Sequence, residues 1–229
     1  MKRHLLLPVV SLGAVQSLYA VDFGYSHTYE DYSKRNFDQF NLSHTFKNNI
    51  TAAFEIRERS ADDKNGNAGR AFSNLEIREY HYKLKYKYRY SDRLTISPDI
   101  GWDHLLQAER YKGRVAFAYK LPHQFQIYNK YRYDYFVNEN RSNFDYYTME
   151  IGLNQSVGDW DLTYGYDQYY SKRNYMYDNK YADFKVKFAA EYKLTKRFKP
   201  YFEIRNESFK NYLSQRQTNF EVGFNYKLF

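Results

Sequence analysis

The 229-residue sequence has no cysteine, only 4 prolines and 10 glycines, and no long hydrophobic run. The absence of cysteine excludes a disulfide framework as a source of stability. No stretch reaches the ~20 consecutive apolar residues that a membrane-spanning helix needs. Leucine, valine and isoleucine are sparse, which argues against an ordinary soluble core. No linker or low-complexity segment divides the chain, so we expect one domain.

Aromatic residues are abundant instead. They make up 21% of the chain, which has 28 tyrosines, yet the mean hydropathy is −0.88. Tyrosine suits a surface on which a side chain meets both lipid and water. The formal net charge of +8 indicates anionic partners such as nucleic acid, lipid head groups or acidic small molecules.

The first twenty residues have the features of a secretory signal peptide. A basic segment at 1–4 precedes a short apolar segment at 5–15, and Ala20 is a small residue at the expected cleavage point. We therefore predict a signal peptide at 1–20, export from the cytoplasm, and a mature domain at 21–229.

Beyond Ala20, apolar and polar residues alternate with the period of a β-strand. Twelve strands are predicted, with outward-facing apolar rows in the ranges 21–29, 40–46, 50–56, 75–90, 94–102, 115–121, 125–135, 147–153, 160–166, 184–194, 198–204 and 220–228. A change of parity between Ile77 and Tyr80 predicts a β-bulge near Arg78 or Glu79. We therefore predict an all-β fold, a twelve-stranded antiparallel transmembrane β-barrel of the outer-membrane type. Such a closed barrel requires an even number of strands. A soluble β-sandwich is the alternative, but it would not need tyrosines facing outward on every strand.

The connections between the expected strands alternate in length. Short turns are expected at 47–49, 91–93, 122–123, 156–159 and 195–197, and longer polar loops at 31–36, 60–72, 105–111, 137–143, 170–179 and 209–215. Outer-membrane barrels have short periplasmic turns and long external loops, which places both termini on the periplasmic side. The final Phe229 resembles the C-terminal aromatic residue that such barrels present to their assembly machinery.

Residues 80–90, YHYKLKYKYRY, have tyrosine or leucine on one face and His81, Lys83, Lys85, Lys87 and Arg89 on the other. A tight turn about Asp92 would place Lys85 opposite Asp99 and His81 opposite Asp103. The remaining three bases would face Gly101, Ser97 and Thr95, none of which is acidic.

Inward-facing bases recur on other strands. The predicted lining of a substrate path consists of Arg57, Arg59, Arg78, Lys83, Lys85, Lys87, Arg89, Arg114, Lys130, Arg132, Lys185, Lys187 and Arg205. In a twelve-stranded barrel the strand of Lys83 lies opposite that of Lys185, Lys187 and Lys193, so two basic rows would face each other. Inward acids, including Glu150, Asp161 and Glu221, would neutralise some of these bases. A narrow lumen with this lining would concentrate anions.

Several short motifs resemble the KdgM-like family of outer-membrane porins: Leu94–Pro98 (LTISP), Tyr131–Asp134 (YRYD) and Lys199–Glu203 (KPYFE). The resemblance extends over essentially the whole mature chain. It implies a monomeric channel in the bacterial outer membrane for acidic oligosaccharides or sugar acids, such as oligogalacturonate or N-acetylneuraminate. It also implies tracks of arginine and lysine side chains that guide carboxylated sugars. Arg132 is the one residue of such a track that a matching motif identifies directly. Lysine stands at many positions where that track leads us to expect arginine, and it binds a carboxylate without a fixed fork.

Other functions find less support. An outer-membrane phospholipase or protease would need a Ser–His or acid–His pair, and His27 and His104 are interpreted as hydrogen-bonded rim residues. An autotransporter translocator would need a passenger and a helix ahead of the barrel. The secretory signal argues against nucleic-acid binding. The loop 62–67 offers oxygen ligands but lacks the closing glutamate of a calcium loop. We therefore predict no enzyme activity, cofactor or metal, and as partners acidic sugars, outer-membrane lipid and the barrel-assembly machinery.

Overall fold

The computed structural model describes residues 21–210 and 212–228. The predicted signal peptide at 1–20 and Phe229 lie outside the described residues. No helix formed by the described part of the chain is long and apolar enough to cross a membrane.

The described residues form strands joined by turns and loops. The strands are β1 (Val21–Glu30), β2 (Asn36–Thr45), β3 (Ile50–Ser60), β4 (Leu75–Tyr86), β5 (Tyr88–Arg89), β6 (Leu94–Leu105), β7 (Ala108–Lys120), β8 (Phe125–Asn138), β9 (Phe144–Val157), β10 (Trp160–Tyr170), β11 (Ala182–Tyr192), β12 (Phe198–Ser208) and β13 (Arg216–Lys227).

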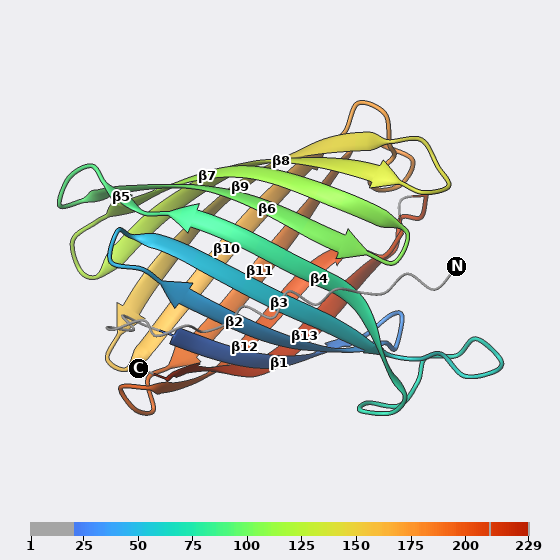
Figure 1. Ribbon diagram of the computed structural model, residues 1–229, viewed down its shortest axis with the longest axis horizontal. Coiled ribbons are helices and arrows are strands. Elements are labelled where there is room, and N and C mark those ends of the chain that lie inside the picture. Colours follow the sequence, from blue (N-terminus) through green and yellow to red (C-terminus); the bar gives the residue numbers. More distant parts are fainter. Residues whose placement is uncertain (1–20, 211, 229) are drawn as a thin grey trace, which may run out of the picture.

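These strands close into one antiparallel barrel (Figure 1). Each strand pairs with its neighbours in chain order, and β1 pairs with β13 from Asp22–Lys227 to Glu30–Asn219. β4 and β5 both pair with β6, and together they make one strand of the wall with a break at Lys87. Pro98 of β6, which has no N–H to donate, lies in the unpaired stretch between the Lys85–Asp99 and Tyr88–Ile96 pairs. The wall therefore has twelve strands over the described residues, which confirms the predicted fold class.

The distribution of side chains is inverted relative to a soluble protein. Within the described part of the chain, Phe136 and Ala190 are the buried hydrophobic residues, whereas Asp103 and Asp134 are fully buried. Ile100, on the outer face, is 64% exposed. An apolar exterior and a polar interior are expected where lipid surrounds the wall and water fills the lumen.

Aromatic side chains stabilise the outer face through contacts between strands. The rings of Tyr82 and Trp102 stack with centroids 5.0 Å apart, and Tyr82 also lies 5.1 Å from Phe54. Tyr25 and Phe40 make a similar pair at 5.1 Å. Cross-strand aromatic pairs each contribute roughly 0.2–1 kcal/mol to a sheet, so the many tyrosines help to hold neighbouring strands in register.

Longer loops lie at one end of the barrel and short turns at the other, as predicted, except for the connection between β6 and β7. The longest loop, 61–74, extends from one end of the barrel (Figure 1). The predicted long loop at 105–111 is wrong, because β6 ends at Leu105 and β7 begins at Ala108. Glu109 interrupts the apolar row there, but Trp102 and His104 hydrogen-bond its carboxylate on the outer face at 2.6 Å each.

The predicted bulge and register around residues 80–90 are confirmed. Arg57 pairs with Glu79 and Glu58 with Ile77, which leaves Arg78 as the extra residue of a bulge. His81 lies opposite Asp103, Lys83 opposite Gly101 and Lys85 opposite Asp99. Because strand parity is thereby fixed, the bases of β4 share the face that is turned into the lumen.

Candidate functional site

A cavity of about 700 Å³ occupies the barrel interior. Eight of its lining residues are lysine or arginine and three are glutamate. The basic residues are Arg57, Lys83, Arg110, Lys112, Arg114, Arg132, Lys185 and Arg205, and the acidic ones are Glu55, Glu79 and Glu207. Nitrogen donors therefore dominate the charged groups that line this cavity.

The cavity brings together six of the predicted lining residues from six strands. They are Arg57 (β3), Lys83 (β4), Arg114 (β7), Arg132 (β8), Lys185 (β11) and Arg205 (β12). The strands of Lys83 and Lys185 lie on opposite sides of the barrel, so both walls supply bases to one space. Lys187 and Arg205 are direct register partners on β11 and β12.

The other seven predicted residues lie outside the lining of this cavity. Lys87 and Arg89 are exposed at the end of the barrel that has the short turns, with Lys85 next to them. Arg59 bonds Asp62 at 3.4 Å and Arg78 bonds Glu76 at 3.5 Å, both near the long-loop end. Lys130 and Lys187 both bond Glu150 at 2.6 Å. The predicted path thus divides into a cavity, a rim at each end and a paired cluster.

Sequence reasoning missed two bases of the cavity, Arg110 and Lys112. Both bond Asp103, Lys112 through its Nζ at 2.6 Å, and His81 Nδ1 lies 2.8 Å from the same carboxylate. Asp103 is 0% exposed. It ties β4, β6 and β7 together and fixes the positions of three side chains. The alternation of Arg110, Lys112 and Arg114 was the available signal. It was missed because 105–111 was assigned to a loop and the next apolar row was taken to begin at 115.

The same arrangement recurs around the lumen, where acids hold most of the bases that line the cavity. Arg114 Nε donates to Asp99 at 2.6 Å, and Arg132 Nε donates to Asp134 at 2.6 Å. Further pairs are Lys185–Asp167 at 2.9 Å, Arg205–Glu203 at 2.8 Å and Arg205–Glu221 at 3.0 Å. Asp99, Asp134, Asp167 and Glu221 are buried, whereas the bases line the cavity. A guanidinium has five N–H donors, so one acid leaves others available to a solute.

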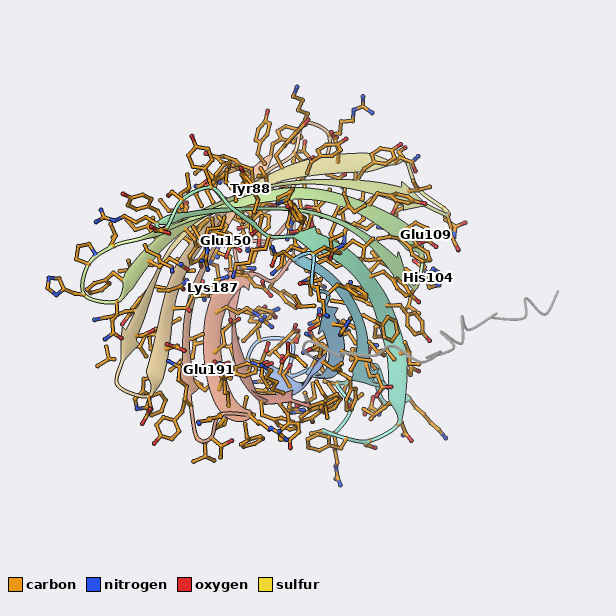
Figure 2. All side chains as sticks on the ribbon, turned by 60° about the vertical axis from the view of Figure 1, so that its left-hand side comes forward. Tyr88, His104, Glu109, Glu150, Lys187 and Glu191 are labelled. Atoms are coloured by element: carbon orange, nitrogen blue, oxygen red, sulfur yellow. The ribbon has the colours of Figure 1, made fainter. Side chains whose placement is uncertain are left out.

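A glycine allows the Lys187–Glu150 pair to form between non-adjacent strands, and a second glycine beside it accommodates an aromatic ring. Lys187 of β11 reaches Glu150 of β9 by crossing β10 at Gly165, where a Cβ would lie 2.5 Å from Lys187 Cε. Gly152 pairs with Gly165, and a Cβ at Gly152 would lie 2.4 Å from the Tyr128 ring. Figure 2 shows Lys187 and Glu150 on the inner side of the wall. These close approaches require glycine at both positions.

The two histidines considered as enzyme candidates lie on the outer face. His27 Nδ1 is 3.0 Å from Asp38, and its ring contacts Phe72 with centroids 4.6 Å apart. His104 Nδ1 is 2.6 Å from Glu109, and Figure 2 shows this pair on the outside of the barrel. Both histidines therefore make hydrogen-bonded contacts away from the cavity.

Comparisons with known proteins agree with this geometry. A family model described as "Oligogalacturonate-specific porin protein (KdgM)" matches residues 14–228. The oligogalacturonate-specific porin KdgM of Dickeya dadantii (strain 3937) is 26% identical over 236 residues, covering 98% of each chain. The NanC porin structure superposes with a TM-score of 0.76 at 15% identity, covering 90% of this chain and 100% of NanC. A structure of the KdgM porin in complex with disordered oligogalacturonate has a TM-score of 0.65 at 19% identity, covering 90% and 98%.

Proposed function

We propose, because this chain belongs to the KdgM family of oligogalacturonate-specific porins and is an outer-membrane channel, that its basic cavity passes acidic oligosaccharides or sugar acids. Transport is passive diffusion down a concentration gradient, without an enzymatic step. In this proposal the channel works as a monomer, since each barrel encloses its own cavity. The oligogalacturonate that accompanies the related KdgM porin is the first candidate substrate class.

The observation that carries the proposal is the excess of bases over acids in the cavity lining. Eight lysine or arginine side chains face the same volume as three glutamates. The buried carboxylates stand behind the bases, so a solute meets N–H groups first. A low-dielectric wall around a narrow aqueous space concentrates the field of such groups, which raises the local concentration of anions.

Aromatic side chains in the same cavity favour a sugar over a simple inorganic anion. Tyr146 and Tyr169 line it, and their rings lie 6.2 Å apart. Arg132 lies 5.9 Å from the Tyr146 ring centroid, and Lys185 lies 5.7 Å from that of Tyr169. Each pair offers an apolar ring next to a positive charge, and a sugar acid has an apolar ring face next to a carboxylate.

Planar bilayer recording tests this function. A salt gradient across a membrane containing the purified barrel should give a reversal potential that indicates anion preference. Digalacturonate and N-acetylneuraminate should interrupt the current, whereas maltose, an uncharged control, should interrupt it much less. Cation preference would refute the proposal, as would equal interruption by charged and uncharged sugars.

A further inference from the structure

One part of the cavity lining is polar but uncharged. Gln39, Asn41 and Ser43 follow one another on β2, two residues apart, and all three line the cavity. Their side chains are partly exposed. Within the part of the chain that the structure describes, none of these three side chains has a hydrogen-bond partner. We name these three residues the β2 row.

The β1 strand leaves space for the row. Gly24 lies opposite Asn41, and a Cβ at Gly24 would lie 2.3 Å from Asn41 Nδ2. Glycine therefore allows the Asn41 amide to lie over β1. Ser43 lies between Asp22 of β1 and Ala53 of β3 and bonds neither of them.

The two charged neighbours of the row on β3 interact with β4 instead. Arg57 Nη1 lies 3.9 Å from Glu79, and Glu55 Oε1 lies 3.5 Å from His81 Nε2. Arg57 and Glu55 are the register partners of the first two members of the row. Because these neighbours have other partners, the amide groups of the row keep their donors and acceptors for water or a solute.

Across the lumen, the cavity lining is basic and aromatic. β2 and β9 are six strands apart in the twelve-stranded wall, so they lie on opposite sides of the barrel. Tyr146 of β9 lines the cavity together with Arg132 of β8 and Tyr169 of β10. A solute between the two walls therefore meets a positive charge and two rings on one side, and neutral polar groups on the other.

The two walls differ in the groups that they can bind. Ammonium and guanidinium groups only donate hydrogen bonds, which suits a carboxylate. Amide and hydroxyl side chains both donate and accept, and so do the hydroxyl groups of a sugar. A carboxylate without hydroxyl groups would gain little from the β2 row, since the row has no charge.

We propose that the β2 row is a subsite for the hydroxyl groups of the substrate, and that it favours acidic sugars over other carboxylates of the same charge. This inference rests on the proposed function, in which bases attract the carboxylate. The row bonds hydroxyl groups on the side of the sugar that faces β2. It contributes to the choice among anions and not to the preference for anions over cations.

Two doubly substituted channels test the inference. The first carries Gln39→Met and Asn41→Leu, which remove the amide groups and keep about the same side-chain volume. The control carries Gln126→Met and Asn154→Leu, the same changes at an amide pair that lies outside the cavity lining and whose side chains bond each other at 3.3 Å. A third channel carries Ser43→Ala, a smaller change in the same row.

Two solutes are compared in planar bilayers. Binding of digalacturonate is measured from the interruption of the current. The permeability of suberate relative to chloride is measured from the reversal potential, because suberate is a dicarboxylate without hydroxyl groups. The first variant should bind digalacturonate about tenfold more weakly, as expected for the loss of two net hydrogen bonds, and Ser43→Ala about threefold more weakly. The control should stay within about 1.5-fold of the unmodified channel. Suberate permeability should not change in any variant, since no charge is altered.

Unchanged digalacturonate binding in the first variant would overturn the inference, and unchanged binding in Ser43→Ala does so where the first variant fails to fold. Equal weakening in the first variant and the control would also overturn it, because any amide of the wall would then serve. A parallel loss of suberate permeability would show that the changes act on the pore and not on hydroxyl contacts. An unmodified channel that does not bind digalacturonate refutes the proposed function itself.

Discussion

Replacing Asp103 by asparagine should destabilise the barrel and strengthen its preference for anions. Asp103 is fully buried and bonds Arg110, Lys112 and His81 from two neighbouring strands. Asparagine keeps the size of the side chain but removes its negative charge. Arg110 and Lys112 would then lose their shared counter-ion, and the lumen would gain one net positive charge.

The expected cost follows from the burial of the pair. Removal of one partner of a buried ion pair typically costs 3–5 kcal/mol. The bases line a water-filled cavity, which screens their repulsion, and the amide oxygen still accepts one hydrogen bond. We therefore expect a loss of about 3 kcal/mol in the free energy of unfolding, at the lower end of that range.

Equilibrium unfolding in urea, followed by tryptophan fluorescence, measures this loss. Trp102 is adjacent in sequence to Asp103 and reports on the same part of β6. Asp92→Asn, in an exposed turn, removes the same charge outside the cavity and should change the stability by less than about 0.5 kcal/mol. If the Asp103→Asn barrel is as stable as this control, or if it prefers anions less than the unmodified channel, the reasoning is wrong.

Two further predictions concern single positions. Gly152→Ala places a Cβ 2.4 Å from the Tyr128 ring and should lower the unfolding free energy by about 1–3 kcal/mol in the same urea assay, whereas Gly113→Ala, with no atom within 4 Å, should be nearly neutral. Hydrogen bonds, first of all from the Asn67 side chain, lower the pKa of Asp63 in the exposed loop, so the turn they hold should persist as the pH falls through the ordinary range of an aspartate and be lost only below it. The amide chemical shift of Asn67 against pH measures this, and a midpoint in the ordinary range would contradict it.

Strand register was the most predictable part of the site. A tight turn about Asp92 and strict alternation were enough to place Lys83 opposite Gly101 and Lys85 opposite Asp99. Register in a hairpin depends on its turn and on which face is apolar, and both can be read locally. The bulge at Arg78 was predictable for the same reason, because parity must change where one residue is extra.

Two contacts between side chains of different strands could not be predicted from the sequence. Lys187 reaches Glu150 across an intervening strand, which requires the close approach at Gly165. The short connection between β6 and β7 was missed because Glu109 carries a charge on the outer face, where its partners come from another strand. In both cases the deciding partner lies on a different strand, and local alternation contains no information about it.

The pairing of β1 with β13 has a consequence for how the protein must fold. Asp22 pairs with Lys227, so closing the barrel requires the first and last strands of the chain to meet. Contacts between such distant parts of a chain are slow to form because of the entropy of loop closure. Until they form, two strand edges with unpaired backbone groups remain open to other chains. The unclosed intermediate is therefore the species most exposed to aggregation, and its lifetime depends on how fast β1 pairs with β13.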